Sequence, residues 1–318
     1  MSILETEGLK TYYLTSRGVV KAVDDVRFRL NAREILGIAG ESGCGKSTLA
    51  LSLMRLVPLP GQIVGGKILL NGEDLLAKNE AELEKIRWKE ISIVFQGSMS
   101  AFNPVLKIGE QISEAILAHM SLKKSDALKR VAELLRLVGI ESSRADNYPH
   151  EFSGGMKQRA MIAMALALNP GVVIADEPTT GLDVIVQAQV LKLLKNLQKR
   201  LKLSMILISH DLSLISEICD KCAIMYAGKI VEYTDTMSIF KTAYHPYVQC
   251  LIKSFPSVRR STELISIPGN PPNLINPPIG CRFHPRCPFA MEVCREVEPT
   301  LTETEKEHYV ACHLMVKE

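Results

Sequence analysis

Short apolar runs alternate with helical patterns over the first two thirds of the chain. Four runs rich in β-branched residues predict buried strands at Ile35–Ala39, Ile91–Phe95, Val172–Ala175 and Met205–Ser209. The segments between them repeat apolar positions at helical spacing. Strands that alternate with helices in this way are typical of an α/β fold, in which helices cover a parallel sheet.

No strand pattern occurs between the second and third of these runs. In its place, Ser121–Ile140 repeats apolar positions every three or four residues beside Lys and Arg, as an amphipathic helix does. We therefore expect a helical subdomain, at about residues 104–170, inserted into the sheet domain.

The last part of the chain has a different texture. Six prolines and little periodicity between Pro256 and Pro278 predict a linker or a wrapped extension rather than a core element. Cysteines follow directly after it. The sequence thus predicts a main domain at residues 1–250 and a Pro-rich, Cys-rich extension at residues 251–318.

The composition and the charge of the chain argue against nucleic acid binding, membrane spanning and secretion. With 38 Lys and Arg against 35 Asp and Glu, the formal charge is only +3, so nucleic acid is not expected as the main partner. The longest uncharged apolar stretch, Ala160–Ala175, contains Pro170 and falls short of the roughly 20 residues that span a bilayer. The amino terminus lacks the apolar run of a secretory signal, so we expect a cytoplasmic chain whose eight cysteines stay reduced.

One glycine-rich segment carries the clearest chemistry. Residues 40–47, GESGCGKS, fit the pattern G-x-x-x-x-G-K-S/T between a predicted strand and an apolar helix at Thr48–Leu56. Glycines let such a loop curl so that its N–H groups face phosphates, and the helix adds its positive dipole end. Lys46 is expected on the phosphates and Ser47 on Mg²⁺. The residues expected to bind nucleotide here are Gly40, Ser42, Gly43, Cys44, Gly45, Lys46, Ser47 and Thr48.

Polar side chains stand where the other predicted strands end. Asp176 and Glu177 follow the third strand, Gln96 follows the second, and His210 follows the fourth. Such groups bind Mg²⁺ and align a water molecule for attack on the γ-phosphate. We expect Asp176 and Gln96, with Ser47, to hold Mg²⁺. We expect Glu177 to act as the general base, with Gln96 and His210 sharing in catalysis.

A second anion-binding helix start is predicted further along the chain. In residues 152–159, FSGGMKQR, Ser153 can cap the apolar helix that follows, while Gly154 and Gly155 leave its first N–H groups open. One domain needs only one phosphate loop. The second helix start is therefore expected to meet the nucleotide of another subunit.

At these residues the chain resembles the ATP-binding subunits of ABC transporters, whose two nucleotide domains close face to face over two ATP molecules. The resemblance implies a P-loop NTPase fold with a RecA-like parallel-sheet core, an antiparallel β subdomain and the inserted helical subdomain. It also implies that Tyr13, in preference to Tyr12, stacks on adenine and that Asp183 lies in the loop that crosses the dimer. Gln96 would be the Q-loop residue and His210 the switch histidine.

The carboxy-terminal segments resemble one branch of that family. His245-Pro246-Tyr247, Ile267-Pro268-Gly269 and the run from Gly280 to Pro288 are similar to the extension of oligopeptide and dipeptide importers. The resemblance implies an ATPase that binds and hydrolyses ATP to drive peptide import. Oligosaccharide or nickel cargo is an alternative within the branch, and a soluble ABC-type ATPase acting on ribosomes or DNA is an alternative of another class.

The resemblance also implies partners and a location. Two transmembrane permease subunits would contact the chain near Gln96 and at residues 97–110. A homologous second ATPase subunit, or another copy of this chain, would complete the dimer, and an extracytoplasmic substrate-binding protein would act indirectly. The chain is accordingly expected to lie peripherally on the cytoplasmic side of the cell membrane.

Four cysteines end the chain: Cys281, Cys287, Cys294 and Cys312. They lack the close pairs on which structural zinc sites are built, and their spacing leaves an iron–sulfur cluster and zinc equally open. The family resemblance favours a 4Fe–4S cluster over zinc. Arg282, Arg286 and Arg295 are expected to offset the charge of four thiolates. Such a metal would staple an extension with too little apolar content to fold by itself.

Overall fold

The computed structural model describes residues 2–97, 101–254 and 267–315, and these form two compact units. One unit comprises residues 31–33 and 77–206. It contains residues 152–159, called the signature below, and is therefore named the signature unit. The other comprises residues 2–30, 34–76 and the chain from residue 207 onward, and is named the phosphate-loop unit. The main domain and the extension predicted from the sequence both contribute to the phosphate-loop unit.

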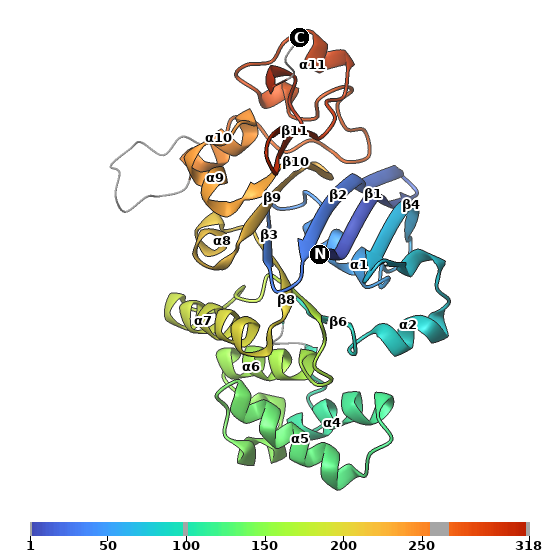
Figure 1. The fold of residues 1–318 in the computed structure, drawn as a ribbon, viewed down its shortest axis with the longest axis vertical. Coiled ribbons are helices and arrows are strands. Elements are labelled where there is room, and N and C mark those ends of the chain that lie inside the picture. The colour runs from blue at the N-terminus through green and yellow to red at the C-terminus, as the bar shows by residue number, and fades with distance from the viewer. Residues whose placement is uncertain (1, 98–100, 255–266, 316–318) are drawn as a thin grey trace. The chain divides into compact units, whose positions relative to one another are not determined.

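An antiparallel sheet begins the phosphate-loop unit. Its strand order is β2-β1-β4-β5, from β1 (Ser2–Thr15), β2 (Gly18–Asn31), β4 (Gly61–Leu70) and β5 (Glu73–Asp74). β1 and β4 run antiparallel, with Leu4 opposite Leu70 and Tyr13 opposite Gly61. Figure 1 shows these strands in blue to cyan beside α1 (Lys46–Leu53). The hydroxyls of Thr11 on β1 and Ser52 on α1 form a hydrogen bond of 2.7 Å. This sheet is the antiparallel subdomain that the family resemblance implies.

A second sheet of this unit carries the phosphate loop. β3 (Ile35–Ala39) runs parallel to β9 (Lys221–Tyr226), and β9 pairs antiparallel with β10 (Lys229–Asp235). On its other side β10 pairs antiparallel with β12 (His308–Val310), and β12 pairs antiparallel with β11 (Thr302–Glu305). The sheet is therefore mixed and not purely parallel. Two strands of the predicted extension join it, because they offer backbone hydrogen bonds to the edge of β10.

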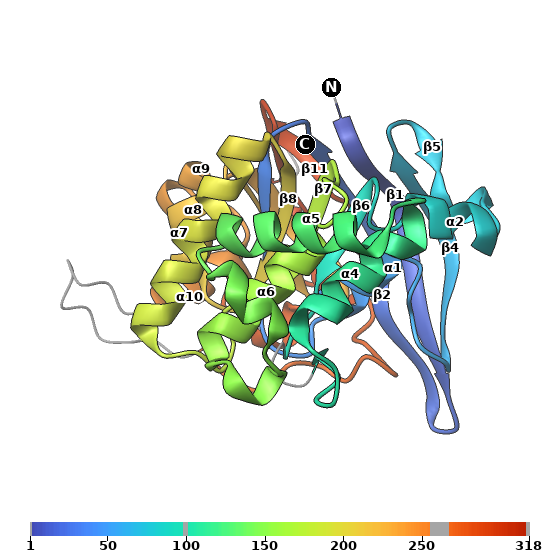
Figure 2. The same ribbon diagram turned by 90° about the horizontal axis from the view of Figure 1, so that it is seen from below.

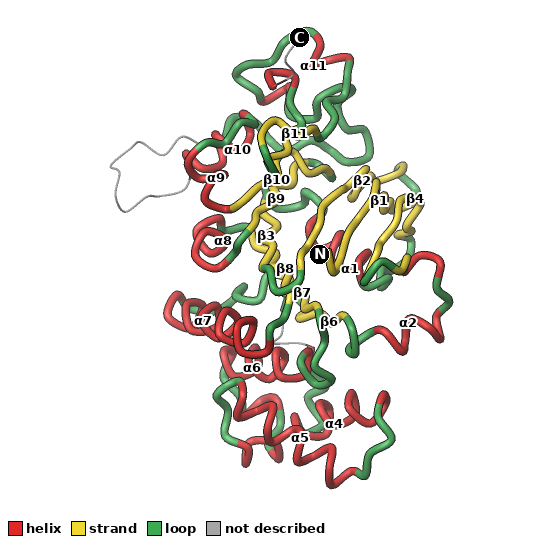
Figure 3. The backbone as a smooth tube through the Cα atoms, in the orientation of Figure 1, coloured by secondary structure: helices red, strands yellow, loops and turns green. Residues whose placement is uncertain are grey.

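Two helices of the same unit contact these strands, namely α8 (Leu212–Ile218) on β3 and α9 (Thr236–Lys241) on β9 and β10. The described part of the unit also contains α10 (Pro246–Lys253) and α11 (Val293–Glu296). Short 3₁₀ turns lie at Leu75–Ala77, His284–Arg286 and His313–Met315. A Cβ on Gly37 would lie 2.6 Å from Ile215, so α8 packs directly on β3. Figure 3 draws the described part of the extension after α10 mostly as loops, with short helices and strand β11. Part of the predicted linker, residues 255–266, lies outside the described residues.

The signature unit is mostly helical. β6 (Ile91–Val94) and β7 (Val172–Asp176) form a parallel pair, and β8 (Ser204–Ser209) leads from this unit into the other. Its helices are α2 (Glu80–Ile86), α4 (Ile108–His119), α5 (Lys124–Leu137), α6 (Gly154–Ala165) and α7 (Val184–Leu201), with 3₁₀ turns at Ser142–Asp146 and Pro149–Glu151. α4, α5 and α6 pack together, as Figures 1 and 2 show from two sides.

Helix α5 shows why this group of helices holds together. Its buried residues, Ala127, Val131, Leu134 and Leu135, follow the spacing of one helix face. That face is covered by α4 and α6, while Lys and Arg occupy exposed positions. Among the described residues, no helix combines the length and apolar character needed to span a bilayer.

His245 at the start of α10 predicts how stability depends on pH. It is buried, and its Nδ1 accepts a hydrogen bond from the N–H of Tyr247 at 3.0 Å. Burial lowers the pKa of His245 to about 3 from its ordinary value of 6.5. Between those values the unfolded chain binds a proton that the folded chain does not, so stability falls as the pH falls below 6.5. The expected loss is about 1.4 kcal/mol per pH unit.

Urea unfolding at pH 7.5 and pH 5 measures this effect. The wild type is expected to lose about 2 kcal/mol more than His245→Gln between these pH values. Other titrating groups affect both proteins alike, so the difference isolates the histidine. His150→Gln, at an exposed position, is the matched control and should follow the wild type. Equal losses in His245→Gln and the wild type would show that the buried imidazole does not set this dependence.

Candidate functional site

The predicted phosphate loop lies between β3 and α1, and its glycines are required by the backbone. Gly40, Gly43 and Gly45 have φ values of 152°, 78° and 106°, which side-chain-bearing residues rarely adopt. A Cβ on Gly45 would lie 1.9 Å from the carbonyl oxygen of Ala22, and one on Gly40 would lie 2.1 Å from that of Met225. The loop is thus wrapped closely against neighbouring backbone. Ser47 and Thr48 follow in the first turn of α1.

Lys46 lies inside the curve of this loop. Its Nζ donates to the carbonyl oxygens of Gly40 at 2.8 Å and Glu41 at 2.9 Å, and the residue is 5% exposed. A cation held on the inner side of the loop is well placed to meet the phosphates of a nucleotide. Ser42 lies in the same loop. Burial raises the pKa of the Cys44 thiol, so this cysteine is a small neutral side chain.

The carboxylate of Glu177 is held by two donors in the signature unit. Oε2 of Glu177 accepts from Nε2 of Gln96 at 3.0 Å and from Oγ1 of Thr180 at 2.8 Å. The pairing of β6 with β7 explains this, because the carboxyl ends of parallel strands meet at one sheet edge. Asp176 is the last residue of β7 and is buried. The structure therefore brings together Gln96 and Glu177, as their strand-end positions predict.

A helix begins at the signature, and another begins at Asp183 in the loop expected to cross the dimer, called the D-loop. Ser153 caps α6, where its Oγ accepts from the N–H of Met156 at 3.3 Å, and Asp183 caps α7 by accepting from Val186 at 3.0 Å. A Cβ on Gly155 would lie 2.5 Å from Val186 Cγ1, so the two helix starts are in close contact. Gly154 is the first residue of α6.

Apolar side chains are exposed on the first turn of α7. Val184 is 80% exposed and Ile185 is 72% exposed, directly after Asp183. Two adjacent exposed apolar side chains make the start of α7 a candidate interaction surface.

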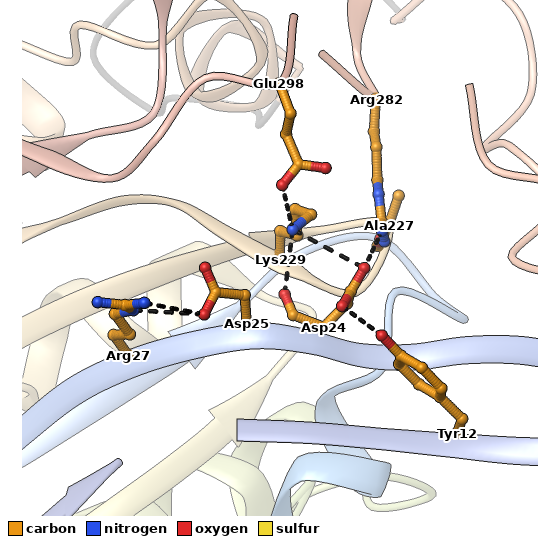
Figure 4. A network of polar contacts seen from close by, with 8 residues as sticks. All are labelled: Tyr12, Asp24, Asp25, Arg27, Ala227, Lys229, Arg282 and Glu298. Atoms are coloured by element: carbon orange, nitrogen blue, oxygen red, sulfur yellow. Dashed lines mark hydrogen bonds and ion pairs between the residues drawn. The ribbon is translucent and has the colours of Figure 1, made fainter. Parts of the chain in front are cut away.

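The two tyrosines considered for adenine stacking differ in their surroundings. The Tyr12 hydroxyl donates to Asp24 Oδ1 at 2.6 Å within the network drawn in Figure 4. The Tyr13 hydroxyl lies 3.4 Å from Oγ1 of Thr48, at the end of the phosphate loop. The Tyr12 hydroxyl thus belongs to the Asp24 network, whereas the Tyr13 hydroxyl adjoins Thr48, which directly follows the phosphate loop.

The nucleotide motifs are divided between the two units. The phosphate loop, Tyr13 and His210 belong to the phosphate-loop unit, with His210 directly after β8. Gln96, Asp176, Glu177 and the residues of the signature and D-loop belong to the signature unit. That the two sets act on one nucleotide stays a prediction.

The metal staple predicted for the extension is not supported by the structure. Among the described residues, no group of three or more His, Cys, Asp and Glu side chains is arranged to hold a metal ion. Burial raises the pKa values of Cys281 and Cys312 to about 11. The structure therefore gives no support to a 4Fe–4S cluster or to zinc held by Cys281, Cys287, Cys294 and Cys312.

Another kind of contact holds the extension in place. Arg282 and Arg286, expected to offset thiolate charge, instead form ion pairs with Asp24 and Glu41. Sequence reasoning missed Glu41 and Asp24, because a carboxylate and a guanidinium that lie far apart in the sequence give no local pattern. The expectation that the extension needs a staple considered only its own apolar content. The structure ties it to the rest of the phosphate-loop unit.

Two family models match the chain. Residues 23–180 match the model described as ABC transporter, and residues 231–294 match the model described as oligopeptide/dipeptide transporter, C-terminal region. The second match spans β10 through α11 and includes Arg282 and Arg286.

Curated relatives match the chain over nearly its whole length. The oligopeptide transport ATP-binding protein OppD of Bacillus subtilis is 45% identical, with 98% of this chain and 89% of that protein covered. The dipeptide transport ATP-binding protein DppD of Caldanaerobacter subterraneus is 42% identical, with 98% and 97% covered.

Solved structures match the fold. A bacterial ABC transporter cassette solved as a dimer has a TM-score of 0.66 and 25% identity, over 73% of this chain and 98% of the other. The same cassette in a post-hydrolysis state bound to ADP and Pi has a TM-score of 0.64 and 25% identity, with the same coverage.

Proposed function

The chain belongs to the ATP-binding proteins of the oligopeptide and dipeptide ABC transporters, and from this premise we propose that it powers peptide import by binding and hydrolysing ATP. One observation carries the proposal: peptide transport ATP-binding proteins are 42–45% identical in sequence to this chain over 98% of its length. It includes the carboxy-terminal region, which matches a model specific to oligopeptide and dipeptide transporters. That match favours a peptide transporter over a soluble ATPase acting on ribosomes or DNA.

The phosphate loop is the proposed site for the ATP phosphates. Lys46 would move its cation from the loop carbonyls to the phosphates, and the start of α1 would add N–H groups. Ser47, Asp176 and Gln96 offer hydroxyl, carboxylate and amide oxygens, which are the donors that Mg²⁺ prefers. When bound, Mg²⁺ would neutralise part of the negative charge of the phosphates.

Glu177 is the proposed general base. Gln96 and Thr180 both donate to its Oε2, which fixes the orientation of the carboxylate. A carboxylate held in this way can align a water molecule and take its proton as the γ-phosphate is attacked. His210, at the end of β8, is proposed to assist at the same γ-phosphate. Tyr13 is proposed to stack on adenine, because it adjoins Thr48 while the hydroxyl of Tyr12 is bonded to Asp24.

A dimer is proposed to complete each site. Ser153 is exposed at the start of α6, Gly154 and Gly155 behind it are half-buried, and Val184 and Ile185 are exposed beside Asp183. A dimer mate would cover this surface, and each signature would then bind the nucleotide of the other subunit. The mate would be a homologous ATPase subunit or a second copy of this chain.

The remaining partners follow from the proposed transport role. Two permease subunits would hold the chain on the cytoplasmic side of the membrane, and an extracytoplasmic binding protein would deliver the cargo. The proposed permease contact includes residues 97–110, of which residues 98–100 lie outside the described residues.

Reconstitution with the permeases, the dimer mate and the binding protein in liposomes tests this function. Labelled di- and oligopeptides are expected to accumulate inside only when MgATP is supplied on the side of the ATPase. Complexes with Glu177→Gln are the control and should show no accumulation. If nickel or an oligosaccharide is taken up and peptides are not, the chain would still be a transport ATPase, but its cargo would not be peptide. ATP hydrolysis that does not respond to the loaded binding protein would contradict the transport role.

A further inference from the structure

Glu41, the second residue of the phosphate loop, is held by an arginine of the extension. Arg286 donates two hydrogen bonds to it, from Nη1 to Oε2 at 2.7 Å and from Nη2 to Oε1 at 2.9 Å. The side chains of Arg286 and Glu41 are 6% and 21% exposed. A paired contact of this kind fixes both the position and the direction of the carboxylate. The loop is therefore tied to a residue 245 positions further along the chain.

Aromatic residues hold this contact in place. The Tyr247 hydroxyl accepts from the backbone N–H of Glu41 at 3.0 Å, and the Tyr226 hydroxyl accepts from Arg286 Nη1 at 3.3 Å. The ring of Tyr226 lies 4.5 Å from that of Tyr247 and 5.2 Å from that of Phe283 in the extension. All three rings are buried, so Arg286 cannot shift without repacking a core.

A second arginine of the extension acts on the other side of the loop. Arg282 donates to a carboxyl oxygen of Asp24 and to the carbonyl oxygen of Ala227, as Figure 4 shows. The adjacent Gly228 donates its N–H to the carbonyl oxygen of Cys44 in the phosphate loop at 2.9 Å. The turn that contains Ala227 and Gly228 is thus bonded to the loop and to the extension.

The Asp24 carboxylate is the centre of this second contact. It also accepts from Tyr12 at 2.6 Å and lies 3.8 Å from Nζ of Lys229, which in turn pairs with Glu298 of the extension. Burial opposes ionisation of Asp24, but the hydrogen bond from Tyr12 and the charges of Lys229 and Arg282 hold its pKa below the ordinary value. The extension therefore contributes charges of both signs to one satisfied network.

We propose that Arg286, supported by Arg282, is a positioning residue for the phosphate loop, so that the carboxy-terminal extension completes the ATP site. An unpaired Glu41 carboxylate within the loop would repel the nucleotide phosphates. Arg286 neutralises this charge and draws it toward the extension, which leaves the inner side of the loop to Lys46. The inference rests on the proposed ATP binding by this loop.

The affinity of the full-length chain for MgATP, measured by isothermal titration calorimetry, tests the proposal. Arg286→Ala is expected to raise the Kd about tenfold, because it leaves the Glu41 carboxylate unpaired beside the phosphates. Glu41→Gln alone should change the Kd by less than about threefold, since it removes the repelling charge. The double variant should recover most of the loss. Arg286→Lys keeps the charge without the planar fork and should give an intermediate Kd. Arg295→Ala, an exposed arginine of the same extension, is the matched control.

The rescue by Glu41→Gln separates positioning from a general loss of structure. If Arg286 served only to hold the fold, removal of the Glu41 charge would not restore affinity, and the proposal would fail. It would also fail if Arg286→Ala kept the wild-type Kd. If Arg286→Ala does not fold, a wild-type Kd for Arg286→Lys would have the same meaning. If the proposal fails in one of these ways but Lys46→Ala binds ATP more weakly than the wild type, the phosphate loop would still be the ATP site. No ATP affinity in the wild type would refute both.

Discussion

Replacing Glu177 with Gln is expected to lower steady-state ATP hydrolysis by at least about a hundredfold, because a positioned general base contributes on this scale. Gln has nearly the same shape as Glu but cannot take a proton from water. The Glu177 carboxylate accepts from Gln96 and Thr180 through one oxygen, and an amide oxygen can accept both bonds. The site geometry should therefore survive while its chemistry is lost. ATP affinity, measured by calorimetry, should stay within about threefold of the wild type, since Glu177 is not in the phosphate loop.

A matched control separates this effect from a change of net charge. Glu84→Gln alters an exposed carboxylate on α2 of the same unit and should hydrolyse ATP at the wild-type rate. Normal steady-state turnover by Glu177→Gln would refute the assignment of the general base. Loss of ATP binding in this variant would instead indicate that Glu177 contributes to the structure of the site.

The same variant should reveal the proposed dimer. With ATP bound and hydrolysis blocked, Glu177→Gln is expected to elute as a dimer in gel filtration, alone or with the homologous subunit. Ser153→Arg introduced into both subunits should prevent this, because a bulky side chain would occupy the helix start that meets the nucleotide. A strictly monomeric ATP-bound form under both conditions would contradict the composite site.

Strands buried on both faces could be predicted from the sequence. The predicted strand at residues 35–39 matches β3, and those at 91–95, 172–175 and 205–209 match β6, β7 and β8 to within one residue. Their residues are all or nearly all buried, so each appears as an unbroken apolar run. β1 and β2 are only partly buried, so neither appears as an unbroken apolar run. β2 alternates buried and exposed residues from Asp24 to Leu30, a strand pattern that was overlooked in the sequence. β11 is largely exposed and charged, and its pairing with β12 stabilises it where composition does not.

The candidate site was predictable where its chemistry is local in sequence. The loop from Gly40 to Ser47 and the strand-end pair Asp176 and Glu177 are short motifs, so their residue types and spacing suffice. The link between Glu41 and Arg286 joins residues far apart in the sequence. Each belongs to a segment with its own local explanation, and nothing in either segment predicts the other. Such pairs require the fold.

The four cysteines of the extension led to a prediction that the structure does not support. Cysteines close in sequence suggested a metal that the described side chains are not arranged to hold. The reasoning assumed that residues 251–318 must be stable by themselves. In the structure, β11 and β12 join the sheet of β10, and Arg282 and Arg286 pair with carboxylates of the phosphate-loop unit. Stability here comes from contacts with the rest of the unit.

Lys46→Ala is expected to raise the Kd for MgATP about a hundredfold, equal to about 2.7 kcal/mol, because charge-assisted hydrogen bonds to phosphate are lost. Lys46 is the cation on the inner side of the loop, and its Nζ is held by the carbonyl oxygens of Gly40 and Glu41. The substitution removes this charge and also two bonds that shape the loop. Calorimetry on the isolated full-length chain measures the effect without a dimer mate or permease.

The pattern across related variants identifies the cause. Lys46→Arg should bind ATP with intermediate affinity, because the charge remains while the longer, planar group does not fit the curve of the loop. Lys192→Ala, at an exposed position on α7, should bind as the wild type does. If Lys46→Ala retained wild-type affinity, the loop could not be the phosphate site. If Lys46→Arg lost as much affinity as Lys46→Ala, the shape of the loop would matter more than its charge. That result would give the contact between Arg286 and Glu41 a larger share in binding, because that contact fixes the same loop from its outer side.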